Sequence, residues 1–257
     1  MNDYLDHLNV SQRKAVEHIS GPLMVIAGAG SGKTRVLTYR IVHLLKNGVD
    51  PFNILSLTFT NKAAKEMKER IEKIVGLDAK NIWMGTFHSV FAKILRYEAD
   101  KLGYPYNFTI YDTDDSKALL RRIIKDMNLD TDIYKVNIVQ SRISSFKNNL
   151  ITVKAYNNNA ELKTQDDSAH RPQMGAIYER YVKECFKSAA MDFDDLLLKT
   201  NELLFRHPDV LHKYQHRFQY VLVDEYQDTN HSQYLIVKAL AALNENICVV
   251  GDDAQSI

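Results

Sequence analysis

A glycine-rich loop between an apolar segment and a helical pattern is the feature that most constrains the fold of this chain. The apolar segment Leu23–Ile26 is typical of a buried strand, and the pattern from Arg35 to Ile41 is typical of the first turns of a helix. Glycines let backbone N–H groups converge on an anion, and the N-terminus of the helix adds positive potential. The sequence therefore predicts a phosphate-binding loop between a strand and a helix. The loop consists of Ala27, Gly28, Ala29, Gly30, Ser31, Gly32, Lys33 and Thr34.

The loop follows the pattern G-x-x-x-x-G-K-[ST], with Ala27 at the first position. Alanine is small enough for the tight turn if its φ is negative. In this pattern the lysine reaches the β- and γ-phosphates and the hydroxyl residue ligates Mg²⁺, which assigns these tasks to Lys33 and Thr34. The alternative is a flexible loop that ends in Lys-Thr by coincidence, and the flanking strand and helix argue against it. We expect a nucleoside triphosphate with Mg²⁺ as the ligand.

The composition is that of an ordinary globular protein, with 257 residues, 45% of them hydrophobic and 25% charged. This length accommodates one large domain or two smaller ones, and the net charge of +1 leaves nucleic-acid binding open. Cys185 and Cys248 lie far apart without metal-ligand spacing, so the sequence predicts neither a disulfide framework nor a zinc site. No stretch approaches the roughly 20 apolar residues of a membrane span. We expect a soluble, cytoplasmic protein.

Strand and helix patterns alternate through the first part of the chain. After a helical start at 11–19, apolar strands are predicted at 23–27, 54–59, 82–87 and 108–111, with helices after the first three at 34–46, 62–75 and 89–102. Strands of this apolar kind that alternate with helices favour a parallel α/β sheet.

The pattern changes to helices between residues 112 and 190. Helices are predicted at 115–127, 134–146 and 173–189, with a polar break at 157–165, and strand signals return at 220–224 and 247–251. The predicted fold class is therefore α/β, a P-loop domain with a parallel sheet that a mainly helical insertion interrupts. Residues 1–111 and 191–257 form the two parts of the nucleotide-binding domain in this prediction, and residues 112–190 form the inserted subdomain.

Two adjacent carboxylates, Asp224 and Glu225, follow the apolar strand that ends at Val223. Neighbouring side chains at the end of a strand point in different directions, so they can take different tasks. Asp224 can hold the Mg²⁺ that bridges the β- and γ-phosphates, and Glu225 can orient and deprotonate an attacking water. An isolated Asp-Glu pair is more often a solvated strand end. The preceding strand and the phosphate loop in the same chain favour the catalytic interpretation, and with it hydrolysis over transfer to a second substrate.

A third apolar strand runs into Asp252, Asp253, Ala254 and Gln255. The Gln255 amide can accept a hydrogen bond from water and donate one to phosphate, so it is a candidate sensor of the γ-phosphate. Because a strand that ends in a polar turn is common, this segment alone is a weak signal.

Six segments beside the phosphate loop stand in a particular order along the chain. Together they closely resemble the UvrD/PcrA/Rep type of superfamily 1 DNA helicase, over nearly the whole length. The resemblance implies a RecA-like P-loop NTPase domain, ATP as the nucleotide, 3′-to-5′ movement on DNA and a task in DNA repair or replication. The segments are Leu8-Asn9-Val10-Ser11-Gln12, Thr58-Phe59-Thr60-Asn61-Lys62-Ala63-Ala64, Gly85-Thr86-Phe87-His88-Ser89, Met191-Asp192-Phe193-Asp194-Asp195-Leu196, Asp224-Glu225-Tyr226-Gln227-Asp228 and Gly251-Asp252-Asp253-Ala254-Gln255-Ser256-Ile257.

The resemblance also implies tasks for single residues. Gln12 would read the adenine edge and Arg35 would pack on the base, while Phe59, His88 and Phe193 would stack on single-stranded DNA. Stacking on an aromatic ring contributes roughly 1–3 kcal/mol per base and tolerates any sequence. Without the resemblance, Phe59 and Phe193 would be interpreted as core residues and His88 as a partly buried histidine. The full set of candidate DNA contacts is Phe59, Thr60, Asn61, Thr86, His88 and Phe193.

The helical insertion corresponds to the accessory subdomain of that family, which can contact duplex DNA. Between residues 133 and 163 its basic residues outnumber its one acidic side chain, Glu161. We expect this face to contact phosphates where single strands meet duplex. An ordinary solvated helix face is an equally weighted alternative. The basic residues are Lys135, Arg142, Lys147, Lys154 and Lys163.

The sequence ends at Ile257, before the second motor domain that the family places after it. That domain donates arginines to the γ-phosphate, and such donors are worth about 10³–10⁵ in rate. We therefore expect the chain to need the C-terminal helicase domains as partners. By itself it should hydrolyse ATP very poorly and leave DNA duplexes intact.

Two other functions remain open at this point. One is the helicase subunit of a recombination nuclease, which shares several of these motifs. The other is an ATP-gated binding module, and Glu225 argues against it because a pure switch needs no hydrolytic base. A guanine-specific switch is disfavoured, since Asn61-Lys62-Ala63-Ala64 lacks the aspartate of the N-K-x-D guanine reader.

Overall fold

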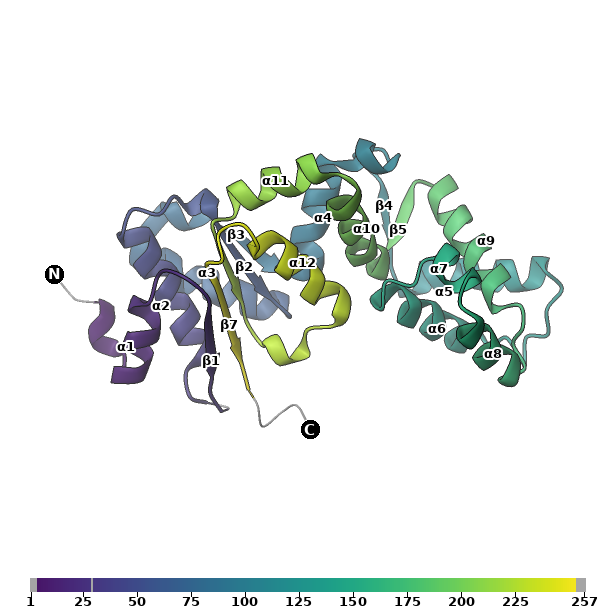
Figure 1. The fold of residues 1–257 in the computed structure, drawn as a ribbon, viewed down its shortest axis with the longest axis horizontal. Helices are drawn as coiled ribbons and strands as arrows, with labels where there is room; N and C mark the ends of the chain where they lie inside the picture. Colours follow the sequence, from purple (N-terminus) through teal and green to yellow (C-terminus); the bar gives the residue numbers. More distant parts are fainter. Residues whose placement is uncertain (1–3, 29, 253–257) are drawn as a thin grey trace. The chain divides into compact units, whose positions relative to one another are not determined.

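The computed structural model describes residues 4–28 and 30–252, and its contacts divide the chain into two compact units (Figure 1). The first unit comprises Met1–Val90, Leu204–Thr229 and Gln233–Ile257, and the second comprises Phe91–Leu203 and Asn230–Ser232. The second unit extends beyond residues 112–190 on both sides. The three-part division at 111 and 190 stays a prediction about domains.

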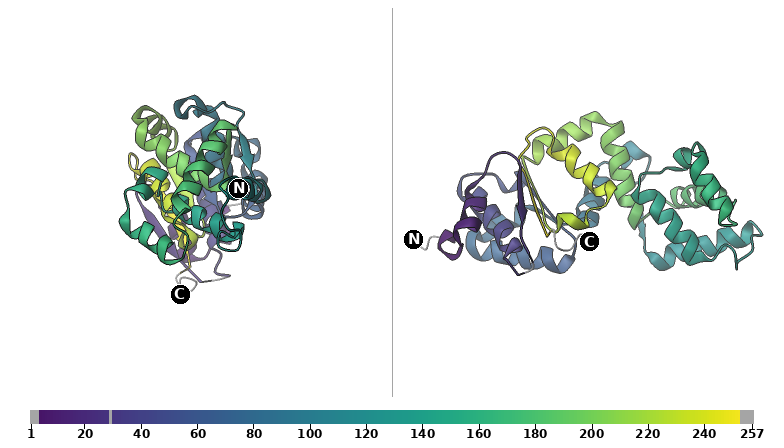
Figure 2. Two further views of the ribbon diagram at one scale, coloured as in Figure 1. Left: turned by 90° about the vertical axis from the view of Figure 1, so that its right-hand side faces the viewer. Right: turned by 60° about the horizontal axis from the view of Figure 1, so that its bottom comes forward.

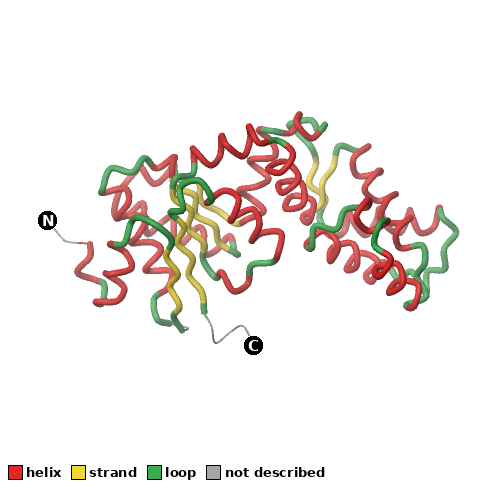
Figure 3. The backbone as a smooth tube through the Cα atoms, viewed as in Figure 1, coloured by secondary structure: helices red, strands yellow, loops and turns green. Residues whose placement is uncertain are grey.

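A five-stranded sheet with only parallel pairings organises the first unit (Figure 3). The strand order is β1-β7-β6-β2-β3, so the two strands from the C-terminal part of the chain, β7 and β6, lie between β1 and β2. The parallel α/β fold class predicted from the sequence is confirmed. The strands are β1 (Leu23–Ile26), β2 (Ile54–Thr58), β3 (Trp83–Thr86), β6 (Tyr220–Val223) and β7 (Ile247–Gly251).

Helices lie on both faces of this sheet, which is why its strands are almost continuously apolar, although Met24 and Ile26 of the edge strand β1 are exposed (Figures 1 and 2). On one face, Leu37, Ile41 and Met67 form a buried core with Leu222 and Val250 of the strands. That face carries α1 (Val10–Glu17), α2 (Lys33–Lys46) and α3 (Asn61–Val75), and the other carries α11 (Pro208–Arg217) and α12 (His231–Ala241). Short 3₁₀ helices lie at Tyr4–His7, Pro51–Asn53, Gly76–Asn81 and Tyr226–Asp228.

The second unit is mainly helical, as predicted. Its core is built from α5, α6, α7 and α9 around buried aromatic side chains such as Phe146, Tyr178 and Tyr181. Its helices are α5 (Thr113–Asp126), α6 (Val136–Asn148), α7 (Val153–Asn157), α8 (Ala160–Ser168) and α9 (Met174–Lys187), with a 3₁₀ helix at Ala99–Leu102. Three helices contribute residues to both units: α4 (Phe87–Tyr97), α10 (Phe193–Arg206) and α12.

Two local predictions were wrong. The strand at 108–111 was grouped with those of the central sheet, but β4 (Thr109–Tyr111) pairs with β5 (Ala190–Asp192) in a separate two-stranded parallel sheet. The polar stretch 157–165 was predicted to break the helices, yet α8 begins within it. Asn159 caps that helix by accepting a hydrogen bond from the Leu162 N–H at 3.0 Å, and an N-cap of this kind supports even a polar helix.

Among residues 4–28 and 30–252, no helix combines the length and apolar character needed to cross a bilayer.

Candidate nucleotide site and nucleic-acid contacts

The predicted motifs meet at one edge of the central sheet. The glycine loop follows β1, Asp252 follows β7 and Asp224 follows β6, and these three strands are neighbours in the order β1-β7-β6. Because the strands are parallel, their carboxyl ends share an edge, which is where open α/β sheets bind ligands. The topology thus brings together residues that lie far apart in the sequence.

The end of the glycine loop depends on glycine at position 32. Gly32 is the N-cap of α2 with φ +88°, in the left-handed region that favours glycine. A Cβ atom there would lie 2.7 Å from Nε2 of Gln12. That Nε2 donates to the carbonyl oxygen of Ser31 at 2.9 Å, while Oε1 of Gln12 accepts from the Asn9 N–H at 3.1 Å. Gln12 is therefore held against the loop, as its predicted contact with the base requires.

The start of the loop accommodates Ala27. Its N–H donates to the carbonyl of Gly251 at 3.1 Å, which ties the loop to the end of β7. Ala27 is not among the non-glycine residues of positive φ in the described chain, whereas Gly30 has φ +76°. The condition set for alanine at this position is met. Ala29, another predicted loop residue, lies outside the described residues.

Lys33 is buried and its Nζ lies 3.1 Å from Oδ2 of Asp252. Asp252 is itself buried, and its backbone N–H donates to Oε1 of Gln227 at 3.1 Å. Neither Asp252 nor Gln227 received a task from the sequence. Their positions directly after the strand β7 and within the Asp224-Glu225 segment were the available signals. Gln255, the predicted γ-phosphate sensor, lies outside the described residues.

Asp224 and Glu225 differ in environment. Asp224 is 3% exposed, and burial, followed by the neighbouring Glu225 charge, raises its pKa to about 6. Glu225 is half-buried, and its Oε2 accepts from Nε2 of Gln227 at 2.7 Å. The backbone at Glu225 has φ +47°, a conformation that costs a non-glycine residue on the order of 1–3 kcal/mol and recurs at functional sites.

Residues of the glycine loop and Glu225 together line a cavity of about 390 Å³. Arg70 of α3 also lines it, although no sequence signal assigned this arginine to the site. The residues present suit Mg²⁺: the Thr34 hydroxyl and the buried carboxylate of Asp224 are hard oxygen donors, and Mg²⁺ usually takes one or two such ligands besides phosphates and water. The lining consists of Gly30, Gly32, Lys33, Thr34, Arg35, Arg70 and Glu225.

The candidate DNA residues of the first unit follow the neighbouring strands β2 and β3. Phe59 is half-buried and its ring lies 5.5 Å from that of Phe87. Thr60 caps α3 by accepting from the Ala63 N–H at 3.1 Å, and the next residue, Asn61, is exposed. At the end of β3, the Thr86 hydroxyl accepts from the Ser89 N–H at 3.2 Å, and His88 is half-buried. These positions fit either stacking or local structure, so the assignments stay predictions.

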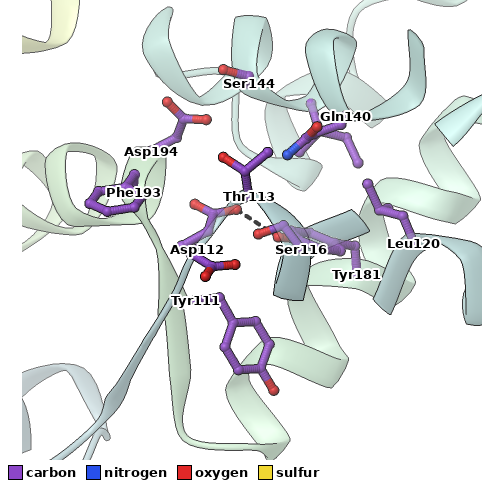
Figure 4. A pocket seen from close by; sticks show the side chains of 12 residues that line it. Tyr111, Asp112, Thr113, Ser116, Leu120, Gln140, Ser144, Tyr181, Phe193 and Asp194 are labelled. Atoms are coloured by element: carbon purple, nitrogen blue, oxygen red, sulfur yellow. Dashed lines mark hydrogen bonds between the residues drawn. The ribbon is translucent and has the colours of Figure 1, made fainter. Parts of the chain in front are cut away.

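Phe193 belongs to the second unit, where it opens α10 with its side chain 49% exposed. It borders a pocket of about 70 Å³ between the start of α10, α5 and α6 (Figure 4). About half of the Phe193 side chain is accessible to solvent, and its assignment as a DNA contact stays a prediction.

The predicted basic face of the insertion needs a correction. Lys147 is 0% exposed and its Nζ lies between Asp192 and Asp195, at 2.7 and 2.9 Å, so it cannot contact phosphates. The Arg142 guanidinium is 3.0 Å from Oδ1 of Asp166. The charge count over residues 133–163 missed these acidic partners, because Asp166, Asp192 and Asp195 all follow that range in the sequence. Lys135, Lys154 and Lys163 are exposed.

A parallel strand, a glycine loop that caps the next helix, a buried lysine and a buried carboxylate after a neighbouring strand define the class of P-loop nucleotide-binding proteins. Within this class, the chain belongs to the family of UvrD/REP helicase N-terminal domains, which it matches over residues 8–257. The ATP-dependent DNA helicase PcrA of Staphylococcus aureus is 46% identical over 258 residues, a match that covers the whole chain and 34% of the relative. PcrA of Staphylococcus epidermidis is 45% identical, with 35% of its length covered. The chain spans about a third of the length of these curated relatives.

Proposed function

We propose that this chain is the ATP-binding portion of an ATP-dependent DNA helicase, which couples ATP hydrolysis to movement on single-stranded DNA and to the unwinding of duplexes. The observation that carries the proposal is the cavity that Lys33, Thr34 and Glu225 line together at the edge of the parallel sheet. The similarity to PcrA over the whole chain supports DNA as the partner, and we expect single-strand/duplex junctions among its substrates.

The catalytic tasks follow from the environments of the side chains. The Lys33 ammonium exchanges its contact with Asp252 for the β- and γ-phosphate oxygens when ATP binds. Thr34 and Asp224 hold Mg²⁺, which when bound neutralises charge on the phosphates. Glu225 accepts a proton from the attacking water, and the hydrogen bond from Gln227 orients its carboxylate for this task.

The nucleotide base is recognised outside the cradle. Gln12, held against Ser31, reads the adenine edge, and the exposed Arg35 packs on the ring. Single-stranded DNA is bound by the segments after β2 and β3, through Phe59, Thr60, Asn61, Thr86 and His88, and by Phe193. Stacking serves a translocating protein because every base offers a π-face.

The relatives are about three times as long as this chain, so the full reaction requires more than the residues described. We expect 3′-to-5′ movement, a task in repair or replication and a cytoplasmic location for the complete protein. The 257-residue chain by itself should hydrolyse ATP very slowly, because it spans about a third of its relatives' length and the resemblance implies that a second motor domain supplies arginines to the γ-phosphate.

Two alternative functions make different predictions. The helicase subunit of a recombination nuclease would use the same ATP site but work only with a nuclease partner. An ATP-gated binding module would bind ATP without DNA-stimulated turnover, and the orientation of Glu225 by Gln227 favours a hydrolytic enzyme over such a module.

The test is ATP turnover by a full-length protein that carries this chain, with and without single-stranded DNA, beside the variant Glu225→Gln. We expect strong stimulation by DNA, and a loss of about 10²–10⁴-fold in turnover for the variant, because it lacks the general base. ATP binding should persist in the variant, since the cradle is intact. If DNA does not change the rate of ATP turnover, the proposal of a DNA-dependent motor is rejected and the ATP-gated binding module is favoured.

A further inference from the structure

The segment that follows Asp224 and Glu225 passes from the first unit into the second within a few residues. Asp224 to Thr229 belong to the first unit, whereas Asn230 and Ser232 belong to the second. The two groups are joined directly by the peptide bond between Thr229 and Asn230. Whatever displaces this segment at one end therefore acts on the other through the backbone.

The turn between Glu225 and Asn230 is closely hydrogen-bonded. The N–H of Asp228 donates to the Glu225 carbonyl at 3.0 Å, and the N–H of Thr229 donates to the Tyr226 carbonyl at 3.1 Å. The Gln227 side chain bonds the Glu225 carboxylate as well. These bonds form a continuous path from Glu225 to Thr229, the residue before Asn230.

The side chain of Asn148, at the end of α6, joins Asn230 to the start of α10. Nδ2 of Asn230 donates to Oδ1 of Asn148 at 2.8 Å, and Nδ2 of Asn148 donates to Oδ1 of Asp194 at 2.8 Å. Asp194 directly follows Phe193. An amide has its acceptor and its donors on one rigid plane, so a rotation that follows one partner changes the bond to the other.

Rigid supports hold both ends of this connection. Beside Asn148, the Lys147 ammonium is buried between Asp192 and Asp195, on either side of Phe193 in the sequence. The Asp195 N–H also donates to Oδ1 of Asp192 at 2.8 Å, which closes the turn that carries Phe193.

The other end has a support of its own. Nδ2 of Asn201, on α10, donates to the carbonyl of Ser232 at 3.0 Å and to its hydroxyl at 2.9 Å. Figure 4 shows Phe193 and Asp194 at the start of their helix, across the pocket from Ser144 of α6, whose carbonyl also accepts from Asn148 at 3.0 Å.

We propose that Asn148 is a positioning residue that couples the DNA-stacking site at Phe193 to the hydrolytic turn at Glu225. The proposal rests on the proposed function, because it takes Phe193 as a DNA contact and Glu225 as the base. In it, single-stranded DNA on Phe193 sets the position of Asp194, the Asn148 amide follows, and Asn230 carries the change into the turn that holds Glu225.

The experiment measures linkage in a full-length protein that carries this chain. The affinity for a non-hydrolysable ATP analogue is determined with and without a thymidine oligonucleotide, and the affinity for the oligonucleotide is determined with and without the analogue. Each pair of measurements gives one coupling factor, the ratio of the two affinities. In the unmodified protein the two factors must agree, and we expect about 5–150-fold, the usual range of such coupling. Asn148→Leu, which removes the donor and the acceptor at similar volume, should bring the factor within about twofold of one while each ligand still binds.

Asn149→Leu is the matched control. Asn149 is the exposed neighbour, and its amide donates to the Ser145 carbonyl of its own helix at 2.8 Å, so this variant should retain the full coupling factor. In a Phe193→Ala background, Asn148→Leu should change the coupling no further. If Asn148→Leu lowers the melting temperature too far for titration, Asn230→Ser removes the same hydrogen bond from its other partner and should show the same loss.

The outcomes separate the two proposals. If the unmodified protein binds DNA and shows coupling, and Asn148→Leu and Asn230→Ser both keep it, the inference about Asn148 is overturned and the proposed function stands. If the unmodified protein shows neither DNA binding nor coupling, the proposed function fails and the inference fails with it.

Discussion

Each unit contains a buried lysine that is paired with aspartate, but only the lysine of the first unit lines a cavity. In the first unit, Nζ of Lys33 lies 3.1 Å from Asp252 and also lines a cavity. In the second, Nζ of Lys147 lies 2.7 Å from Asp192 and 2.9 Å from Asp195 with no exposed surface. One lysine has a partner that a ligand can replace, whereas the other is enclosed by its partners.

The enclosed cluster illustrates how charge becomes part of a core. Burial alone would lower the pKa of Lys147, but the carboxylates of Asp195 and Asp192 raise it well above its ordinary value. The hydroxyl of Tyr181 donates to Asp192 at 2.8 Å and completes the set of bonds. A lysine bound in this way serves structure, and the comparison teaches that access to a cavity separates a ligand-binding lysine from a structural one.

The largest effect should come from breaking the enclosed cluster. Lys147→Met leaves two buried carboxylates without their cation, and removing one partner of a buried ion pair typically costs about 3–5 kcal/mol. Urea denaturation at pH 7 should show a loss of this size in the free energy of unfolding of the 257-residue chain.

Lys33→Met is the comparison variant, and we expect a smaller loss of stability with the loss of ATP binding. Adding Asp192→Asn and Asp195→Asn to Lys147→Met should recover part of the stability, because the amides carry no charge. An equal loss of stability for Lys33→Met and Lys147→Met would contradict the difference between the two lysines.

A moderate effect is expected at Asp224, where the sign depends on pH. The pKa of about 6 in the folded chain lies above the ordinary 3.8, so the folded state binds the proton more tightly than the unfolded state. This contribution to stability is present at low pH and is lost as the pH rises through 6. At pH 7 the ionised carboxylate therefore destabilises the ligand-free fold, on the order of 3 kcal/mol.

Asp224→Asn should consequently stabilise the ligand-free chain at pH 7 and change little at about pH 4, as measured by urea denaturation. In the same variant, Mg²⁺ should no longer increase the affinity for ATP. Asp78→Asn removes an exposed carboxylate and serves as the control, with little change expected at either pH. A destabilised Asp224→Asn at pH 7 would show that the carboxylate is needed for the fold itself.

The smallest effect is expected at Arg70, the cavity residue without a sequence signal. Arg70→Ala removes a cation from the rim of the cavity, and at an exposed position this should weaken ATP binding by several-fold, or roughly 1 kcal/mol. Isothermal titration calorimetry at low and high salt would measure it. Glu66→Gln breaks the exposed ion pair of Arg70 at 3.7 Å but keeps the arginine, so ATP affinity should stay or rise.

The glycine loop and the strands were predictable because their signals are local. Apolar runs predict buried parallel strands. The pattern with Gly32, Lys33 and Thr34 predicts a phosphate-binding loop, because glycine permits the tight turn directly before the helix. The carboxylates Asp224 and Glu225 could be placed from the strand that precedes them. For these residues, sequence and structure agree because neighbours in the chain are also neighbours in space.

Other features depend on contacts between distant segments and could not be predicted from the sequence. Nothing near Lys147 in the sequence announces Asp192 and Asp195, so a core lysine was interpreted as a phosphate contact. The pairing of β4 with β5 likewise joins segments separated by the whole helical region. Arg70 enters the cavity only because α3 packs beside α2, which its own sequence does not reveal.

The short pairing of β4 and β5 has a consequence for how this chain can change over generations. Thr109–Tyr111 lie in parallel register with Ala190–Asp192, so residues 112–189 form a single crossover connection between two paired strands. A parallel pair needs a crossover of a dozen or more residues, and this connection is far longer than that minimum. Genetic recombination at the ends of this connection can exchange α5 to α9 for another helical insert only if the insert supplies new partners for Asp192 and Asp195 in place of Lys147 and Tyr181.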